Sequence, residues 1–320
     1  MRKIVIYSPS RLAISVLNMN KFSPGILGGG GIGLSPSHYS KIILSPRQSK
    51  EDYISSPNRL VVIHFLDVFR HIFSLNNHYS VIVSSDIMPH SGEGSTNSII
   101  LGLIKGLLHY HQIKLSDSEI FELYVNNVME EHSGNLVLGY ESGVGTWSIL
   151  KGGMVFLDDN SFLARSIQID SSFQILIVRP KHLKRLSFQM ESSIIDDIGK
   201  EQDCIDYPNK LNLFFGAIDL TNNSCIDNQI LLFRALSGFR DIGSKVHEIA
   251  AMNALYDGLY DSLIAIGNVA EIKLHCLSSL GPTYFYVDDK EHLELASKKI
   301  NQAQFHKNIY SFSHGIAVLD

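Results

Sequence analysis

The segment VIVSSDIMPHSGEGSTNSIILGLIKGLLHYH, residues 81–111, contains the pattern that decides the fold. Its apolar, β-branched beginning predicts a strand, and its long apolar end predicts a helix over residues 96–111. Between them lies SGEGST, residues 91–96, in which two glycines precede a hydroxyl pair. This order of strand, glycine loop and helix makes either a tight turn into a buried helix or a loop that holds a phosphate group.

The loop has the residue types of an anion site at a helix N-terminus. The first N–H groups of a helix have no partner within the helix, and the helix dipole favours negative charge there. Gly92 and Gly94 would let the backbone turn tightly and approach a ligand closely. Ser95 and Thr96 can cap the helix, donate to phosphate oxygens or bind Mg²⁺. On this stretch alone a serine-capped turn with no ligand is the better interpretation, because isolated glycine motifs often occur without one, and the phosphate loop stays open as the alternative.

Two further segments combine small hydroxyl residues with glycines. They are ESGVGTWSILKGG, residues 141–153, and CLSSLGPTYFYV, residues 276–287. Ordinary turns could supply each of them singly. Three such loops are more than chain connectivity requires, which favours a common binding site.

The order of predicted elements indicates an α+β fold. Strands and helices are mixed irregularly, without the strict alternation of a doubly wound parallel sheet. The chain has 320 residues, enough for two domains. We expect an N-terminal phosphate-binding domain over residues 1–170 and a C-terminal α+β domain over residues 171–320.

Several local patterns predict individual elements. Helical spacing of apolar residues predicts a helix over residues 58–74 and two helices over residues 228–265. Ser116 and Glu119 have the spacing of a capping box, which would open a helix ending near residue 134. Residues 144–160 predict a hairpin that is bent at a Gly-Gly pair.

Composition excludes several classes of protein. The net charge of −5 argues against a nucleic-acid partner, which would need a basic surface. No run reaches the roughly 20 apolar residues of a membrane helix, and the N-terminal IVIY is too short for a signal peptide. We therefore expect a cytoplasmic protein.

Cysteines and histidines do not form a metal motif. Cys204, Cys225 and Cys276 are far apart and none lies in a CxxC pair, so neither a disulfide framework nor a zinc site is indicated. His109 and His111 form an HxH pair, but no spacing supplies a third ligand. Surface or helix-end positions are the better interpretation of these histidines.

The three loops together resemble those of the GHMP small-molecule kinase superfamily. Its phosphate loop, between a strand and a helix, has the form PxxxGLGSS. Residues 89–96, PHSGEGST, stand in that place, with Glu93 where leucine is usual. The resemblance implies a two-domain GHMP-kinase-like fold.

Within the superfamily, the closest resemblance is to the beta-ribofuranosylaminobenzene 5'-phosphate synthases. Their central SGIGT and following GG pair are matched by residues 142–146 and 152–153. Their late SSWGPT is matched by residues 278–283, apart from the tryptophan. An N-terminal SRL and a downstream GG(V/I)GL are matched by residues 10–12 and 30–34, so the resemblance covers nearly the whole chain.

This resemblance implies a glycosyltransferase of methanopterin biosynthesis. Such an enzyme joins phosphoribosyl pyrophosphate to a 4-substituted benzoate, with loss of pyrophosphate and carbon dioxide. The departing pyrophosphate charge would need backbone N–H groups and Mg²⁺, and the ribosyl cation would need a closed, partly apolar site. The resemblance also favours a homodimer.

Site residues follow from the matched motifs. The pyrophosphate would be held by Gly92, Gly94, Ser95 and Thr96, with Ser95 or Thr96 as a Mg²⁺ ligand. The residues implied in catalysis are Arg11, Ser142 and Thr146. The remaining substrate site would be lined by Gly31, Gly33, Gly143, Gly145, Ser278, Ser279, Gly281 and Thr283.

Two basic residues are the candidates for binding negative charge. Arg11 could pair with a phosphate or with the benzoate carboxylate, because its planar fork suits both, although a surface ion pair explains it equally well. Lys151 is a weaker candidate, for which a solvated lysine is the better interpretation.

Four positions depart from the synthase pattern. Ala13, Asn18, Gly29 and Glu141 stand where the synthases usually have histidine, aspartate, an acidic residue and arginine, respectively. Each departure removes or reverses a polar or charged group. The departures indicate either another substrate or a weakened or lost activity.

Two alternatives therefore stay open. In an ATP-dependent small-molecule kinase the same loop would hold the ATP phosphates, and Asp158 or Asp159 could act as base, although both resemble hairpin-turn residues. The SSxGPT motif favours the synthase, because the kinases more often have GGxG there. A non-catalytic ligand-binding relative would explain the four departures.

Overall fold

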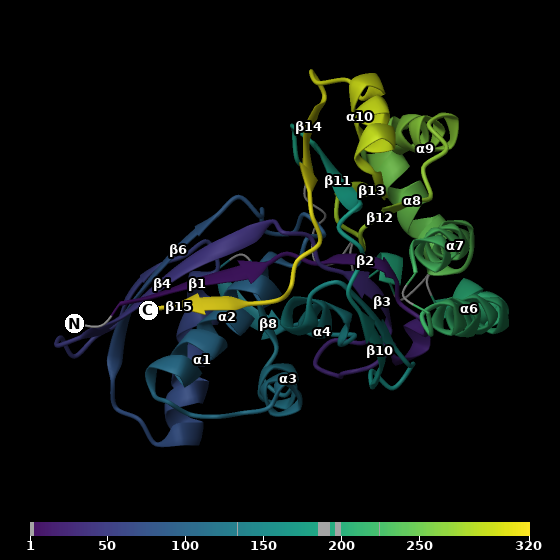
Figure 1. Ribbon diagram of the computed structural model, residues 1–320. Helices are drawn as coiled ribbons and strands as arrows, with labels where there is room; N and C mark the ends of the chain where they lie inside the picture. The colour runs from purple at the N-terminus through teal and green to yellow at the C-terminus, as the bar shows by residue number, and fades with distance from the viewer. Residues whose placement is uncertain (1–2, 133, 185–192, 196–199, 224) are drawn as a thin grey trace.

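The computed structural model describes residues 3–132, 134–184, 193–195, 200–223 and 225–320. They form a two-domain α+β protein in which helices cover three main β-sheets (Figure 1). Within these residues, no helix has both the length and the apolar character needed to span a bilayer.

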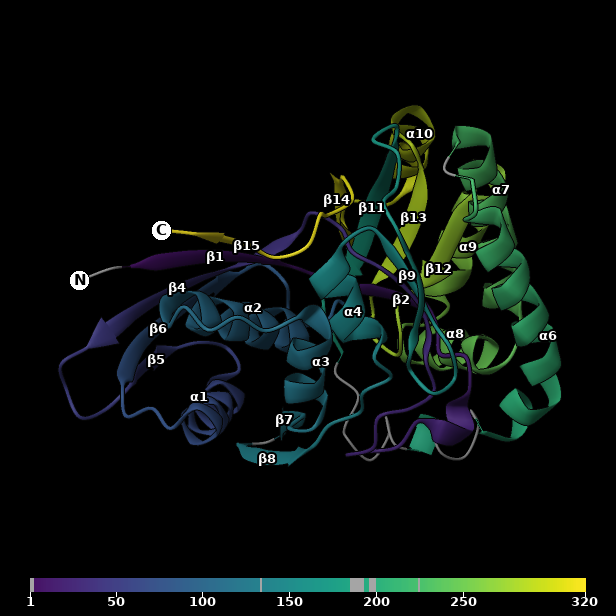
Figure 2. The same ribbon diagram turned by 60° about the horizontal axis from the view of Figure 1, so that its bottom comes forward.

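The first sheet is built mainly from the N-terminal part of the chain. Only its β5–β6 pair is parallel among the pairings described. Helices α1 (Arg59–Phe73) and α2 (Ser95–Tyr110) pack beneath it (Figure 2). Across the sheet the strands are β15 (Ala317–Leu319), β1 (Ile4–Pro9), β4 (Tyr39–Arg47), β6 (His78–Ser85) and β5 (Tyr53–Ser55).

The second sheet is buried on both faces. Its order is β10 (Leu163–Ile167), β9 (Met154–Leu157), β3 (Gly31–Leu34) and β2 (Leu12–Ser15). Alternate residues of β9 belong to different cores: Val155 and Leu157 pack in the core around α2, whereas Met154 and Phe156 pack in the core of the third sheet. The second sheet therefore separates two hydrophobic cores and contributes side chains to both.

Smaller elements lie beside these two sheets. Helix α4 (Val144–Lys151) packs on the second sheet and on α2, and α3 (Asp117–Val125) packs on α4. The other elements are the 3₁₀ helix η1 (Met19–Lys21) and a hairpin of β7 (Met129–His132) and β8 (Asn135–Leu138).

The third sheet is built from the C-terminal half of the chain. Its order is β12 (Leu274–Leu277), β13 (Tyr284–Asp289), β11 (Phe173–Pro180) and β14 (Phe305–Tyr310). The helices of this half are α6 (Lys200–Leu220), α7 (Ile226–Ser237), η3 (Gly238–Asp241), α8 (Ser244–Leu255), α9 (Leu259–Val269) and α10 (Lys290–Lys299). One face of the third sheet packs against α8, α9 and α10, and its other face shares a core with the second sheet, α6 and α7 (Figure 2).

Several predicted elements are confirmed. The helix predicted over residues 58–74 is α1, and the helix predicted over residues 96–111 is α2. Ser116 and Glu119 form the predicted capping box, in which the Ser116 side chain accepts from the Glu119 N–H and the Glu119 carboxylate accepts from the Ser116 N–H. The helix that they open ends at Val125, earlier than predicted.

The hairpin predicted over residues 144–160 is wrong. Helix α4 occupies Val144–Lys151, because Gly143 starts it from a left-handed conformation and the Gly152-Gly153 pair ends it. The hairpin lies one element later, between β9 and β10. Two helices were predicted over residues 228–265, but the structure has three there, α7, α8 and α9, with breaks near Gly243 and Gly258.

Helix α2 approaches the first sheet closely through two glycines. A Cβ added to Gly102 would lie 2.6 Å from Ile42 Cδ1 and 2.9 Å from Ser8 Cβ. A Cβ added to Gly106 would lie 2.7 Å from Ile6 Cδ1. The two glycines therefore let α2 lie directly against β1 and β4 of the first sheet.

We expect Gly102→Ala to destabilise the protein by about 1–3 kcal/mol, because the new methyl group overpacks a filled core. Gly216→Ala in α6 is the control, since nothing lies within 4 Å of its Cβ position and alanine is favoured in helices by up to about 1 kcal/mol. Urea unfolding measures both changes. A Gly102→Ala variant as stable as the wild type would contradict the close packing of α2.

Candidate active site at the N-terminus of α2

The glycine loop lies at the N-terminus of α2, whose N-cap residue is a glycine and so has no side chain for capping. Gly92 and Gly94 have φ of 85° and 66°, conformations that favour glycine. Gly94 is the N-cap residue and makes no side-chain capping hydrogen bond. The Thr96 hydroxyl instead accepts a hydrogen bond of 2.6 Å from Asn58 Nδ2. The first turn of α2 therefore keeps donors for an anion.

Two loop carbonyls are directed toward donors of the protein. Gly92 O accepts from Arg11 Nη1 at 3.0 Å and from Ser278 Oγ at 2.6 Å. Glu93 O accepts from the Arg11 N–H at 3.0 Å. Carbonyls held in this way do not compete with an anion for the loop N–H groups, and the Arg11 guanidinium adds positive charge beside them.

The three glycine–hydroxyl loops meet at this point. A Cβ on Gly281 would lie 2.1 Å from the backbone nitrogen of Gly92, and a Cβ on Gly92 would lie 2.3 Å from Ser278 O. A Cβ on Gly145, in the central motif, would lie 2.7 Å from Asn97 Nδ2 in the first turn of α2. Glycine is needed at all three positions because neighbouring chain segments fill the space.

A pocket of about 120 Å³ opens at the junction of these loops. The predicted site residues that line it are Arg11, Gly92, Gly94, Ser95, Thr96, Ser279 and Gly281. The lining residues that sequence reasoning did not single out are His90, Asn97, Tyr124, Val128, Met129, Glu130, Tyr140, Lys184, Met252, Leu280 and Pro282.

Two of these lining residues have strained backbones. His90 and Ser279 have φ of 57° and 54°, in the left-handed region that non-glycine residues rarely adopt. Such conformations cost about 1–3 kcal/mol each and gather at ligand sites. The strain is consistent with a loop shape selected for binding.

Other predicted site residues do not line the pocket, and these are Gly31, Gly33, Ser142, Gly143, Gly145, Thr146, Ser278 and Thr283. Their contacts give several of them structural roles. Gly33 makes room for Ser148 and Val144 of α4, and Gly31 lies against Ser15 O. Ser278 Oγ accepts a hydrogen bond from the N–H of Ala13, the residue that stands where the synthases have histidine. This hydrogen bond links β2 to the loop after β12.

Lys151 and the candidate bases Asp158 and Asp159 also lie outside the pocket lining. Lys151 Nζ is 2.8 Å from an Asp117 carboxylate oxygen. Asp158 accepts from backbone N–H groups of the turn after β9, and Asp159 pairs with Lys21 at 2.8 Å. These contacts describe structural ion pairs and turn residues.

Glu141 is buried beside the first turn of α2. Its carboxylate accepts from Asn97 Nδ2 at 2.8 Å and from the Gly143 N–H at 2.7 Å. Burial raises the pKa of Glu141, and the Gly143 and Asn97 hydrogen bonds and the charge of Arg11 offset part of that rise. Glu141 thereby fixes Asn97, which lines the pocket.

The pocket contains oxygen ligands that suit Mg²⁺. Ser95, Thr96 and Glu130, whose side chains carry oxygen atoms, all belong to its lining. Mg²⁺ is usually held by one or two carboxylates together with substrate phosphates. These residues therefore fit the metal that the sequence motifs imply.

Elsewhere in the described part of the chain, Asp288, Asp289 and His292 lie close enough to share an ion. Lys273 Nζ already forms ion pairs with both carboxylates, and the Asp289 side chain caps α10. Their present contacts make them a helix-capping cluster on the third sheet.

Solved structures of similar fold cover almost the whole chain. A homoserine kinase from Cytophaga hutchinsonii matches with a TM-score of 0.68 and 12% identity, over 100% of this chain and 98% of that one. A Methanococcus jannaschii mevalonate kinase matches with a TM-score of 0.67 and 14% identity, over 97% of this chain and 98% of that one. A Lactococcus lactis galactokinase complexed with galactose matches with a TM-score of 0.67 and 11% identity, over 99% of this chain and 95% of that one.

These similarities establish the fold class. The chain has the two-domain α+β fold of the GHMP kinases, as its motifs predicted. No protein-family model matches the sequence, and no curated protein matches it.

We expect Gly94→Val to weaken the binding of inorganic pyrophosphate at least ~10-fold. A β-branched residue at this φ carries a strain energy of about 1–3 kcal/mol, and relief of that strain distorts the loop. Gly258→Val is the matched control: it also begins a helix from a left-handed conformation, with φ of 77° and open space around it. Isothermal titration calorimetry measures the affinity of each variant. Equal affinity in the two variants would argue against the anion cradle.

Glu141 also generates a prediction about pH. A carboxyl group whose folded pKa is raised contributes stability that is complete below the unfolded value of 4.5 and is lost as pH rises through the folded pKa. The stability of the wild type relative to Glu141→Gln should therefore fall as pH rises from 4.5 toward neutrality. Urea unfolding of both proteins across this range tests the sign. If the wild type instead gains stability relative to Glu141→Gln as pH rises, the pKa of Glu141 is not raised.

Proposed function

We propose that this protein is a Mg²⁺-dependent transferase that holds the phosphate chain of its donor substrate at the N-terminus of α2. The observation that carries the proposal is the junction of the three motif loops around a helix N-terminus whose N-cap residue is a glycine, with Arg11 beside it. Backbone N–H groups and a guanidinium stabilise phosphate charge that is present in the substrate and increases as the bond breaks. Mg²⁺, when bound, would neutralise further charge on the leaving phosphates.

For the donor we put phosphoribosyl pyrophosphate first, with an aromatic carboxylate as acceptor. The matches to SGIGT and SSWGPT support this choice. The lining of the pocket also includes apolar and aromatic residues, namely Tyr124, Tyr140, Val128, Met252 and Leu280. Such a surface accepts a flat ring and keeps water from a ribosyl cation.

In this reaction the chain supplies position and electrostatics. The loop N–H groups hold the pyrophosphate, and Arg11 pairs with a phosphate or with the acceptor carboxylate. The bond between the anomeric carbon and pyrophosphate breaks, a carbon–carbon bond to the ring forms, and the carboxylate leaves as carbon dioxide. The apolar and aromatic lining residues orient the ring toward the anomeric carbon.

An ATP-dependent small-molecule kinase is the second candidate, and the fold favours it. The three proteins of similar fold named above are kinases for homoserine, mevalonate and galactose. Phosphoryl transfer depends almost entirely on positioning and electrostatic stabilisation, which the same loop and Arg11 can supply.

A parallel assay separates the candidates. The protein is incubated with Mg²⁺ and phosphoribosyl pyrophosphate, together with 4-aminobenzoate or 4-hydroxybenzoate, and pyrophosphate release is followed. A second arm supplies ATP with homoserine, mevalonate or galactose and follows ADP. We expect pyrophosphate release that requires both Mg²⁺ and the aromatic acid, and that is lost in Gly94→Val but not in Gly258→Val.

The other outcomes identify the alternatives. ADP formation without pyrophosphate release would establish the kinase. Binding of phosphoribosyl pyrophosphate or ATP without turnover, detected as a thermal shift, would indicate a non-catalytic ligand-binding relative. No shift with either ligand would contradict the phosphate site itself.

A further inference from the structure

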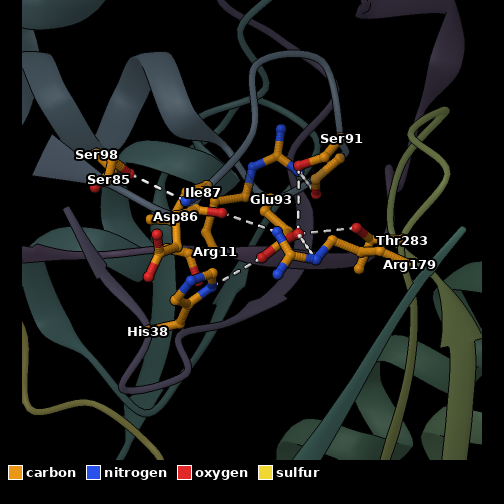
Figure 3. Close-up of polar contacts among 12 residues, drawn as sticks. Arg11, His38, Ser85, Asp86, Ile87, Ser91, Glu93, Ser98, Arg179 and Thr283 are labelled. Carbon is orange, nitrogen blue, oxygen red and sulfur yellow. Dashed lines mark hydrogen bonds and ion pairs between the residues drawn. The ribbon is translucent and has the colours of Figure 1, made fainter. Parts of the chain in front are cut away.

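A carboxylate is buried at the centre of the glycine loop. The side chain of Glu93 is fully inaccessible to solvent and does not belong to the lining of the pocket. Figure 3 shows it surrounded by His38, Arg179 and Thr283. One of its oxygens lies 3.0 Å from His38 Nδ1. The other accepts from Thr283 Oγ1 at 3.0 Å and Ser91 Oγ at 3.3 Å, and lies 3.4 Å from Arg179 Nε.

The contacts determine how the charge is balanced. The Arg179 guanidinium is itself buried and is the permanent positive charge beside Glu93. When Glu93 is ionised its carboxylate only accepts hydrogen bonds, and His38 Nδ1 is then the donor between them. The His38 ring is stacked on Tyr310 at 4.8 Å, which fixes its orientation.

The partners of Glu93 come from opposite sides of the molecule. His38 precedes β4 of the first sheet, whereas Arg179 lies in β11 and Thr283 precedes β13 of the third sheet. Arg179 Nη1 also donates to Asp86 O, just after β6, at 2.9 Å. The loop is therefore tied at one residue to both the first and the third sheets.

We propose that Glu93 is a positioning residue, whose buried carboxylate fixes the glycine loop to the third sheet through Arg179 and Thr283 and so sets its geometry for phosphate. The proposal deepens the proposed function and rests on it. It assigns a purpose to a charge at a position where an apolar side chain is usual in similar loops.

The electrostatics of the loop give this arrangement a direct consequence. An uncompensated carboxylate in the loop would repel a bound phosphate, and the positive charge of Arg179, 3.4 Å from Glu93, offsets that negative charge. Removing one member of a buried pair leaves an unpaired charge, whereas replacing both members by apolar residues is often neutral for stability. Stability and loop geometry can therefore be separated by mutation.

The experiment compares Glu93→Gln, the double variant Glu93→Leu/Arg179→Met, and the control Asp52→Asn. Asp52 makes a half-buried ion pair with Arg70 at 2.6 Å and does not line the pocket. Titration calorimetry with inorganic pyrophosphate and Mg²⁺ gives the affinities, and thermal unfolding gives the melting temperatures. Hydrogen exchange of peptides covering residues 88–96 reports the loop directly.

We expect Glu93→Gln to weaken pyrophosphate binding at least ~10-fold, because this factor corresponds to the loss of about one charge-assisted hydrogen bond. The double variant should regain the melting temperature of the wild type but stay at least ~10-fold weaker in affinity. Asp52→Asn should lower the melting temperature and leave the affinity unchanged. Wild-type affinity in Glu93→Gln or in the double variant would overturn the proposal.

Failure of the proposed function gives a different result. In that case the wild type binds none of pyrophosphate, phosphoribosyl pyrophosphate or ATP. Hydrogen exchange then tests Glu93 alone: faster exchange over residues 88–96 in Glu93→Gln, and not in Asp52→Asn, supports its positioning role. Unchanged exchange in Glu93→Gln overturns that role.

Discussion

The contact on which the candidate site depends is between two backbones. The glycine loop and the loop that follows β12 approach until there is no space for a side chain at Gly92 or Gly281. The Thr283 N–H donates to Ser91 O at 3.1 Å, so the contact is hydrogen-bonded as well as close. Since β12 belongs to the third sheet, this contact brings the two halves of the chain together at the α2 N-terminus.

Local patterns in the sequence predicted the parts of the site that depend on neighbouring residues. The strand, loop and helix over residues 81–111 were predictable because the apolar spacing and the glycines of one short segment determine them. Helix α4 was not, because a short, mostly apolar segment that ends in two glycines fits a hairpin as well as a short helix. The left-handed Gly143 that starts α4 is visible only in the structure.

The meeting of the motif loops was predictable from the sequence, but the individual side-chain contacts across the fold were not. Glu93 was recognised as a departure from the usual leucine, but its partners Arg179 and Thr283 lie 86 and 190 positions away in the chain. The pocket residues Tyr124 and Glu130 lie in segments without glycine or hydroxyl motifs. Charge offers a partial signal, since a carboxylate inside an apolar loop requires a buried cation somewhere.

The shared second sheet limits how the molecule can move. Its strands bury one face against the core around α2 and the other against α6 and α7, so the two halves have a continuous apolar interior. Domains swing about a hinge when their interface is small and polar, and this interface is neither. Any movement that accompanies binding is therefore expected in the loops and side chains around the pocket, and not in a swing of one half of the chain against the other.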